Sequence, residues 1–275
     1  MPKPALTPAM IRRLRATVYD YFRNHGRTLP WRTDFDSYHI FVSEVMLQQT
    51  QVDRVVMKFE AFIDRFPDFA ALASAPLKEI FALWQGLGYN RRALNLKQAA
   101  EAVIREHGGA LPTTPEALST LPGIGRATAA SIVAFAFNRP TIFLETNIRT
   151  VLIHHFFHDA DSVSDAELLP LAEALIDKRN PRKWYSALMD YGTSLKKLHG
   201  NASRRSANYK AQGSFEGSRR QKRGRILKLL LNQNSLNVKQ IADALAIDST
   251  LCDGILDELV KDGIIGKTRG RYRVA

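Results

Sequence analysis

A glycine-rich turn, an apolar helix and a carboxylate follow one another in LPGIGRATAASIVAFAFNRPTIFLETNIRTV, residues 121–151. Gly123 and Gly125 let the backbone come close to a phosphate, and the amides that open the next helix carry partial positive charge. A turn of this kind can bind a nucleic-acid backbone without reading its bases, and similar turns also serve as plain helix connectors. Glu145 opens the helix after that and is a candidate for acid–base or electrostatic chemistry.

A second carboxylate lies near polar residues that interrupt an apolar stripe. From 42 to 66 the apolar residues keep helical spacing, but Gln48, Gln49 and Thr50 break it. The break predicts two helices that meet at QQT, and a functional site is one explanation for such a local inconsistency. Glu44 precedes the break on the first helix. The alternatives are a polar helix junction and a solvated carboxylate.

The elements that position these residues are predicted to be helices, because helical periodicity dominates and no alternating strand pattern precedes the last dozen residues. Pro170 leaves the start of one helix open, since an interior proline costs about 3 kcal/mol. Further helices are expected from Pro76 to the GLG turn at 86–88, over 90–107, from Pro115 to the LPGIG turn, around 167–178, and from Pro181 to about Leu198.

Composition limits the classes of partner and site. The 275 residues are 45% hydrophobic, enough for one or two cores, and 39 Lys and Arg against 27 Asp and Glu give a net charge of +12. This charge favours nucleic acid or an acidic membrane surface. The single cysteine, Cys252, excludes an internal disulfide and a four-thiolate zinc or iron–sulfur site within one chain. Without a leader-like or spanning apolar run, we expect a cytoplasmic protein with no membrane association.

The C-terminal part differs in character from the rest. Between Lys196 and Arg225, ten basic residues meet one acid, Glu216, which predicts a cationic connector. Three helical stretches and a terminal hairpin follow, an order that resembles a winged helix-turn-helix domain. We expect a core over 1–215 and this domain over 216–275.

Several motifs together resemble the helix-hairpin-helix DNA glycosylase superfamily that includes endonuclease III, and within it the adenine DNA glycosylase (MutY) branch. They are LPWR (29–32), SEVMLQQTQV (43–52), WQGLGYNRRALNL (84–96), HGG (107–109) and the hairpin itself, all in the family's order. The resemblance covers residues 10 to 200. It implies an all-α, two-lobed helix-hairpin-helix glycosylase core, followed here by the small C-terminal winged helix-turn-helix domain.

The resemblance implies chemical roles for four residues. Breaking a base–sugar bond needs a carboxylate beneath the sugar and a proton donor near the base. Glu145 occupies the position of the family's Asp, although Glu is a poorer helix N-cap because its extra methylene moves the oxygens from the first amides. Glu44 matches the acid that protonates the purine and needs a pKa raised by burial. Asn147 resembles the residue that orients the sugar-side carboxylate, and Tyr89 the pocket tyrosine; capping and packing are the alternatives.

Further residues are implied as DNA contacts. One of Gln48 and Gln49 would wedge into the duplex where the target nucleotide is flipped out. The hairpin contributes Gly123, Gly125 and Arg126 to the strand contact. The phosphate contacts would come from Arg91, Arg92, Arg204 and Arg205.

Three absences refine the expectation. Ala127 stands where bifunctional relatives carry a lysine nucleophile, so no lyase step is expected. The four cysteines that usually close the family's core are replaced by HGNASRRSANYK after Lys197, so we expect no iron–sulfur cluster, no metal and no other cofactor. Where members of the family usually carry a large C-terminal domain that senses 8-oxoguanine opposite the adenine, about 60 residues resembling a winged helix follow, so we expect the opposite-base check to be absent or different.

The resulting hypothesis is a monofunctional DNA glycosylase of base excision repair that excises a damaged or mispaired base, with adenine favoured. Its partner would be double-stranded DNA containing a lesion or mismatch, bound by a nucleoid-associated monomer. One alternative is a glycosylase for a mispaired or modified pyrimidine, uracil or thymine. The other is a non-catalytic, structure-specific DNA-binding protein.

Overall fold

Two compact units make up the chain in the structure, a computed structural model that describes residues 6–275. Residues 1–5, part of the N-terminal stretch for which no leader is expected, lie outside that range. Unit 1 comprises Met1–Phe41, Thr113–Ser119 and Ile124–Ala211, and unit 2 comprises Val42–Pro112, Thr120–Gly123 and Gln212–Ala275. The boundary passes through helix α2 (Ser37–Leu47) and the LPGIG turn. The C-terminal segment of unit 2 begins at Gln212, and the division expected at residue 215 remains a prediction.

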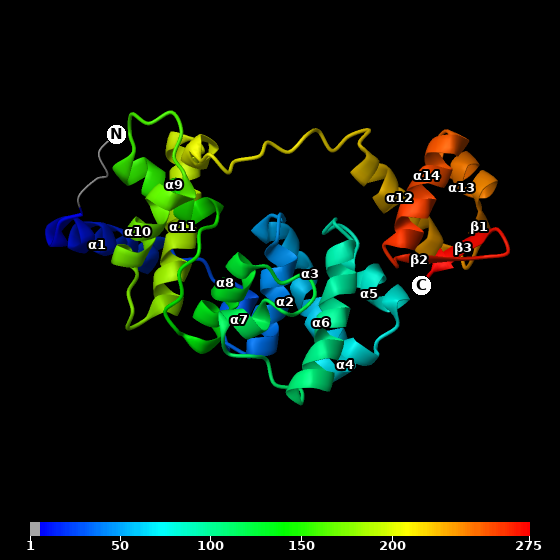
Figure 1. Cartoon of the computed structure of the whole chain (residues 1–275), viewed down its shortest axis with the longest axis horizontal. Helices are drawn as coiled ribbons and strands as arrows, with labels where there is room; N and C mark the ends of the chain where they lie inside the picture. Colours follow the sequence, from blue (N-terminus) through cyan, green and yellow to red (C-terminus); the bar gives the residue numbers. More distant parts are fainter. Residues whose placement is uncertain (1–5) are drawn as a thin grey trace. The chain divides into compact units, whose positions relative to one another are not determined.

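Unit 1 is a group of helices around one apolar core (Figure 1). Helix α11 (Pro181–His199) packs against α1 (Pro8–His25), α8 (Arg126–Phe137) and α9 (Thr146–Phe156), and α9 also packs against α10 (Asp165–Leu175). Trp184 and Tyr185 of α11 are almost fully buried in that core. The elements are α1 (Pro8–His25), η1 (Pro30–Arg32), α7 (Pro115–Leu118), α8 (Arg126–Phe137), α9 (Thr146–Phe156), α10 (Asp165–Leu175), α11 (Pro181–His199) and η2 (Ala202–Arg205).

Helix α10 starts earlier than expected and contains Pro170. Ser164 and Glu167 form a capping box at its start, and the backbone N–H of Ser164 donates to the Glu167 carboxylate at 2.8 Å. This cap fixes the first turn, so the helix begins at Asp165 and tolerates the proline five residues later. The expected range of 167–178 is therefore corrected to Asp165–Leu175.

Unit 2 begins within α2 (Ser37–Leu47) and confirms the break at QQT, because α3 (Val52–Arg65) starts after it. The core of this unit includes Phe62, which packs edge-on against Phe66 and Trp84 at centroid distances of 5.0 and 6.1 Å. The remaining helices before the hairpin are α4 (Phe69–Ser74), α5 (Leu77–Trp84) and α6 (Arg91–His107).

The C-terminal segment of unit 2 contains three helices and a small antiparallel sheet of order β1-β3-β2 (Figure 1, orange to red). Its elements are α12 (Arg219–Asn232), β1 (Leu236–Asn237), α13 (Val238–Leu245), α14 (Ser249–Lys261), β2 (Ile265–Thr268) and β3 (Arg271–Val274). Leu236 pairs with Tyr272, and Ile265 with Val274. The two-residue strand β1 was not expected, because it is too short to show alternation.

The basic residues at 219–223 lie on α12, not in a connector. Arg219 and Arg223 form ion pairs with Glu258 of α14 at 2.7 and 2.8 Å, and Arg223 also pairs with Asp262 at 2.6 Å. The prediction of a cationic connector is therefore corrected: two of these charges hold α12 against α14.

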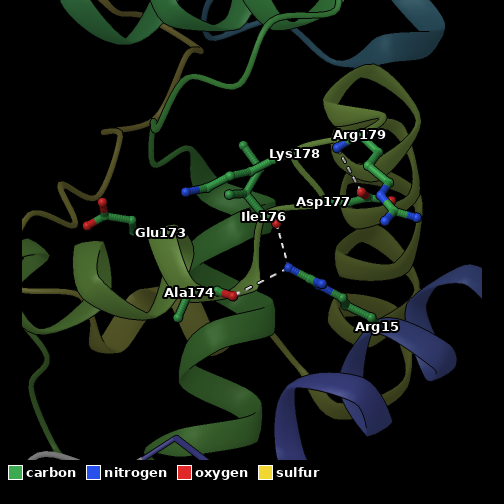
Figure 2. A pocket seen from close by; sticks show the side chains of 7 residues that line it. All are labelled: Arg15, Glu173, Ala174, Ile176, Asp177, Lys178 and Arg179. Carbon is green, nitrogen blue, oxygen red and sulfur yellow. Dashed lines mark hydrogen bonds between the residues drawn. The ribbon is translucent and has the colours of Figure 1, made fainter. Parts of the chain in front are cut away.

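Among the described residues, no helix is both long enough and apolar enough to span a lipid bilayer. A pocket of unit 1, shown in Figure 2, lies between α1 and the end of α10 and contains none of the predicted site residues. There the Arg15 guanidinium donates to the carbonyls of Leu175 and Ile176 at 3.0 and 2.5 Å. A cation at the carboxyl end of a helix is a stabilising arrangement, so the pocket has a structural explanation.

Candidate functional site

Glu145 is the N-cap of α9 and is partly buried. Its Oε1 accepts hydrogen bonds from the backbone N–H groups of Asn147 at 2.6 Å and Ile148 at 2.9 Å. The expectation that Glu is too long to cap well is therefore wrong here: the extended backbone at Glu145 (φ −122°, ψ 177°) leaves room for the carboxylate to fold back over the first turn. One carboxylate oxygen is thus fixed by the backbone.

The second oxygen of Glu145 faces the side chain of Asn147. Asn147 Nδ2 lies 3.4 Å from Glu145 Oε2, and Lys196 Nζ of α11 donates to Asn147 Oδ1 at 2.6 Å. Since an ammonium group only donates, Lys196 fixes the orientation of the amide and turns its NH₂ group toward the carboxylate. Lys196 therefore orients Asn147, whose amide faces Glu145; that Asn147 orients a catalytic carboxylate stays a prediction.

One face of α11 brings Lys196 to this position. Met189, Gly192 and Lys196 are spaced i, i+3 and i+7, so they lie along the same side of the helix. A Cβ atom on Gly192 would stand 2.6 Å from the backbone oxygen of Asn147, and Met189 Sδ lies 3.7 Å from Asn147 Nδ2. The absence of a side chain at Gly192 thus permits the close approach of α9 and α11 that the Lys196 contact requires.

Burial and the surrounding groups shift the pKa of Glu145 in opposite directions. Burial raises its pKa, while the backbone hydrogen bonds and the positive charge of Lys196 act to lower it. Burial lowers the pKa of Lys196, and the Glu145 charge opposes that shift. Arg149, one turn into α9, pairs with Asp165 at 2.8 Å. The charges of Lys196 and Arg149 both favour the ionised form of Glu145, and Lys196 also contacts its partner Asn147.

In unit 2, Arg92 joins the QQT turn to the GLG turn. Its guanidinium donates to the carbonyls of Val45 and Met46 at 2.9 and 2.8 Å, to the Thr50 hydroxyl at 2.8 Å, and to the carbonyls of Leu87 and Gly88 at 3.2 Å. Burial lowers its pKa to about 10. The expected phosphate contact at Arg92 is therefore corrected, because its donors satisfy the end of α2 and hold two turns together.

The QQT turn also contacts the hairpin. Gln48 Nε2 donates to the carbonyl of Gly123 at 3.3 Å. Gly123 has φ +77°, and a Cβ atom there would lie 2.7 Å from Asn95 Cβ, so both conformation and space require glycine. Gly125, the N-cap of α8, has φ −82°, and a Cβ atom there would meet nothing within 4 Å. The backbone at Gly125 therefore borders open space, and Arg126 next to it is exposed.

The remaining predicted residues of unit 2 are placed as follows. Glu44 is partly buried on α2, one helical turn before Gln48, and its protonation role stays a prediction. Tyr89 and Gln49 are exposed and have positive φ values of 47° and 54°. Arg91 is exposed, with Nη1 3.4 Å from Asp262 Oδ1.

The segment after α11 is held by hydrogen bonds of Arg205. Arg205 Nη1 donates to the carbonyls of Phe157, His158 and Ala160 at 2.6, 2.9 and 3.1 Å, and the Val163 N–H donates to the Arg205 carbonyl at 2.8 Å. The chain's one thiol, Cys252, is buried in α14. These donors do not fit an iron–sulfur cluster. Arg204 is exposed; DNA contacts by Arg204 and Arg205 remain predictions.

Lys196 is the site residue that the sequence analysis missed, because it was counted only as the first charge of the connector. The signal was available in MDYGTSLK, where Met189, Gly192 and Lys196 recur at helical spacing. The contacts of Gln212 and Arg220 with Tyr89 were missed as well, since they depend on tertiary structure.

Comparisons with known proteins agree with the motifs. The family model described as HhH-GPD superfamily base excision DNA repair protein matches residues 42–172. An adenine DNA glycosylase of Mycolicibacterium smegmatis is 32% identical over 276 residues, covering 94% of this chain and 93% of that protein. Among solved structures, a thermostable thymine-DNA glycosylase aligns with a TM-score of 0.61 and 24% identity, covering 70% of this chain and 90% of that one.

Other relatives are longer. An adenine DNA glycosylase of Buchnera aphidicola is 36% identical over 181 residues, which cover 65% of this chain and 52% of that protein. The matched part thus spans about half the length of the Buchnera relative, and 36 to 38% of three mammalian proteins with the same name. Over nearly its whole length, however, the chain aligns with the mycobacterial relative. The chain therefore belongs to the HhH-GPD superfamily of base excision DNA repair proteins, in the family of the adenine DNA glycosylases.

Proposed function

We propose that this chain is a monofunctional DNA glycosylase that extrudes a mispaired adenine from double-stranded DNA and hydrolyses its bond to deoxyribose. The observation that carries the proposal is the arrangement of Glu145, Asn147 and Lys196. It presents one carboxylate oxygen that the backbone does not use, next to an oriented amide. The family membership supplies the context of base excision.

In this mechanism the bond between the base and C1′ breaks, its electrons leave with the base, and positive charge develops on the sugar. The ionised Glu145 carboxylate stabilises that charge, and Asn147 and Lys196 keep the carboxylate in one orientation. Protonated Glu44 gives its proton to the purine ring, which makes adenine a better leaving group. Water then adds to C1′ and releases a proton, which leaves an abasic site.

Several finer features belong to the same proposal. Ala127, the second residue of α8, offers no amine for a Schiff base, so the strand stays intact after base removal. Only one thiol is present in the sequence, so catalysis needs no iron–sulfur cluster or other cofactor. The C-terminal segment acts as a winged helix-turn-helix domain, and the protein works as a cytoplasmic, nucleoid-associated monomer.

A panel of duplexes tests the function. Each duplex carries one candidate base: adenine opposite guanine, 8-oxoguanine or cytosine, or uracil or thymine opposite guanine. After incubation, hot alkali cuts at abasic sites, and a sample without alkali reports any lyase step. We expect cleavage of the adenine duplexes only after alkali. Cleavage of only the uracil or thymine duplexes would show that the excised base is a pyrimidine and not adenine. No cleavage of any duplex would contradict the proposed glycosylase activity.

Glu145→Gln separates chemistry from folding. The amide oxygen can still accept the two backbone hydrogen bonds, while the negative charge is lost. We expect single-turnover base removal to fall about a hundred- to a thousandfold, the range for losing one electrostatic contact to a transition state. Because the folded protein raises the pKa of Glu145, its ionisation costs folding free energy above the unfolded pKa. The variant should therefore unfold no more easily than wild type at pH 7, as urea denaturation measures.

A further inference from the structure

The two exposed turns of unit 2 that carry Gln49 and Tyr89 are both held in a costly backbone conformation. Each of these non-glycine residues has a positive φ, at 54° and 47°. Arg92 joins the two turns by donating to the Thr50 hydroxyl and to the carbonyls of Leu87 and Gly88. Strained conformations persist only where the surrounding structure enforces them, and they concentrate at functional sites. The surrounding structure therefore fixes the backbone from which each of these two exposed side chains projects.

The C-terminal segment contacts both of these side chains. The side-chain amide of Gln212 donates to Gln49 Oε1 at 3.4 Å and also to the Tyr89 hydroxyl. Arg220 Nη1 donates to the same hydroxyl at 2.9 Å, with its Cζ 5.9 Å from the centre of the Tyr89 ring. We call these four residues, Gln49, Tyr89, Gln212 and Arg220, the turn cluster.

Attachment of the C-terminal segment does not depend on the turn cluster. Helix α12 packs against α5, Lys78 Nζ donates to Asn234 Oδ1 at 3.2 Å, and Arg91 lies 3.4 Å from Asp262. The hydrogen bonds of the cluster are exposed, so exchanging them for contacts with another molecule costs little. Arg219 and Arg223 differ in this respect, because their charges pair with Glu258.

The chemistry of the turn cluster fits nucleobases. An amide and a guanidinium fork match the hydrogen-bonding edges of bases, arginine in particular the O6 and N7 acceptors of guanine, and a tyrosine ring can stack on a base. A side chain that fills the space of an extruded nucleotide must lie against the base that was paired with it. If Gln49 fills that space, its neighbours Gln212, Tyr89 and Arg220 are within reach of the unpaired base.

We propose that Arg220 and Gln212 contact DNA together with Gln49 and Tyr89, and that Arg220 reads the edge of the purine left unpaired when the target nucleotide is extruded. This inference rests on the proposed function. It gives the C-terminal segment a defined part in recognition: it supplies the guanidinium that distinguishes an opposing purine from a pyrimidine.

The test measures binding, with catalysis removed by Glu145→Gln in every protein. Affinities at one salt concentration are compared for duplexes with adenine opposite guanine, 8-oxoguanine or cytosine. The Glu145→Gln protein should prefer the two opposing purines, and adding Arg220→Ala should reduce that preference roughly 5- to 150-fold, the value of one bidentate arginine contact. Arg220→Lys should retain part of it. The matched control Lys78→Ala, which removes one charge from another contact of the C-terminal segment, should leave the preference unchanged.

Three results would overturn the proposal. No preference in the Glu145→Gln protein would mean that the opposing base is not read. An equal loss of affinity for all duplexes with Arg220→Ala would show that Arg220 contacts phosphate and reads no base. Tighter binding of that variant to all duplexes would show that the turn cluster inhibits DNA binding. Base removal by the wild-type protein is assayed separately. If the wild type removes no base while Arg220→Ala abolishes the purine preference, the proposed glycosylase function is wrong, but recognition of the opposing purine by Arg220 is supported.

Discussion

At the scale of single residues, Lys196 is one of the groups that act to lower the pKa of Glu145, and it fixes the orientation of Asn147. Lys196→Met keeps a long side chain but removes the positive charge and the 2.6 Å hydrogen bond to Asn147 Oδ1. Because that charge opposes the raised pKa of Glu145, the variant should raise this pKa further. In the proposed mechanism base removal needs ionised Glu145, so the acid limb of the pH–rate profile should move to higher pH.

A shift of about one pKa unit would lower the rate at pH values below the limb about tenfold. The measurement is single-turnover base removal between pH 4 and pH 9, with the exposed neighbour changed in Lys197→Met as the control. A uniform loss of rate with no movement of the acid limb would show that Lys196 supports the fold alone.

The sequence could predict contacts between residues of one motif, but not contacts with a partner on another helix. Glu145 and Asn147 were predicted with their relation to each other, because they are two residues apart in one helix start. Lys196 was not predicted as their partner, since the contact depends on how closely α9 and α11 pack. Arg92 was expected to contact phosphate because nothing local distinguishes a buried arginine from an exposed one.

At the scale of elements, the approach of α11 to α9 sets the geometry of the Glu145 site. In Gly192→Ala, the new Cβ atom would stand 2.6 Å from a backbone oxygen of α9, so the helices must move apart. Overpacking of this kind costs about 1–3 kcal/mol, and the Lys196 contact with Asn147 should be lost with it. We expect lower stability in urea and slower base removal.

Gly224→Ala is the matched control, since Gly224 also lies inside a helix but a Cβ atom there would meet nothing within 4 Å. That variant should gain up to about 1 kcal/mol of stability from helix propensity and keep its activity. If Gly192→Ala is as stable and active as Gly224→Ala, the close approach is not needed for the site.

The two hairpin glycines give a second prediction at this scale. Gly123→Ala should destabilise the fold, because the residue has φ +77° and contacts Asn95. Gly125→Ala should fold normally, because its φ is negative and the space beside it is open. If a phosphate approaches the backbone there, the added methyl should weaken DNA binding about tenfold or more without a change in unfolding, as titration with labelled duplex measures. Unchanged affinity in Gly125→Ala would place the strand elsewhere.

Most helices could be predicted because their signals are local. The apolar stripe broken at QQT gave the ends of α2 and α3, and the glycines after Trp84 and His107 gave the ends of α5 and α6. Strand β1 has only two residues and no pattern of its own, because it exists through pairing with β3. The start of α10 was missed although its Ser164–Glu167 capping box is a sequence signal.

At the scale of the whole molecule, the sequence could not show how distant segments combine. Unit 2 takes up the C-terminal segment from Gln212 onward, and unit 1 combines α1 with helices more than 100 residues later. Such groupings depend on which apolar helix faces pack together. The periodicity of apolar residues within each helix does not show which other helix its apolar face will contact. The net charge of +12, by contrast, is known from the sequence alone.

The structure changes which of these charges can be used to test DNA binding. Charge reversal at Arg219 and Arg223 would place acids opposite Glu258 and should separate α12 from α14 before it reports on DNA. Arg204 and Lys210 are exposed and suit the test better. Each phosphate contact contributes about 0.9 to the slope of log affinity against log salt, so the double variant Arg204→Gln, Lys210→Gln should flatten that slope by up to twice this value. Titrations from low to high KCl measure the slope, and urea unfolding checks that the fold is unchanged. An unaltered slope would show that Arg204 and Lys210 do not contact phosphate, so that any contribution of these two charges is long-range attraction.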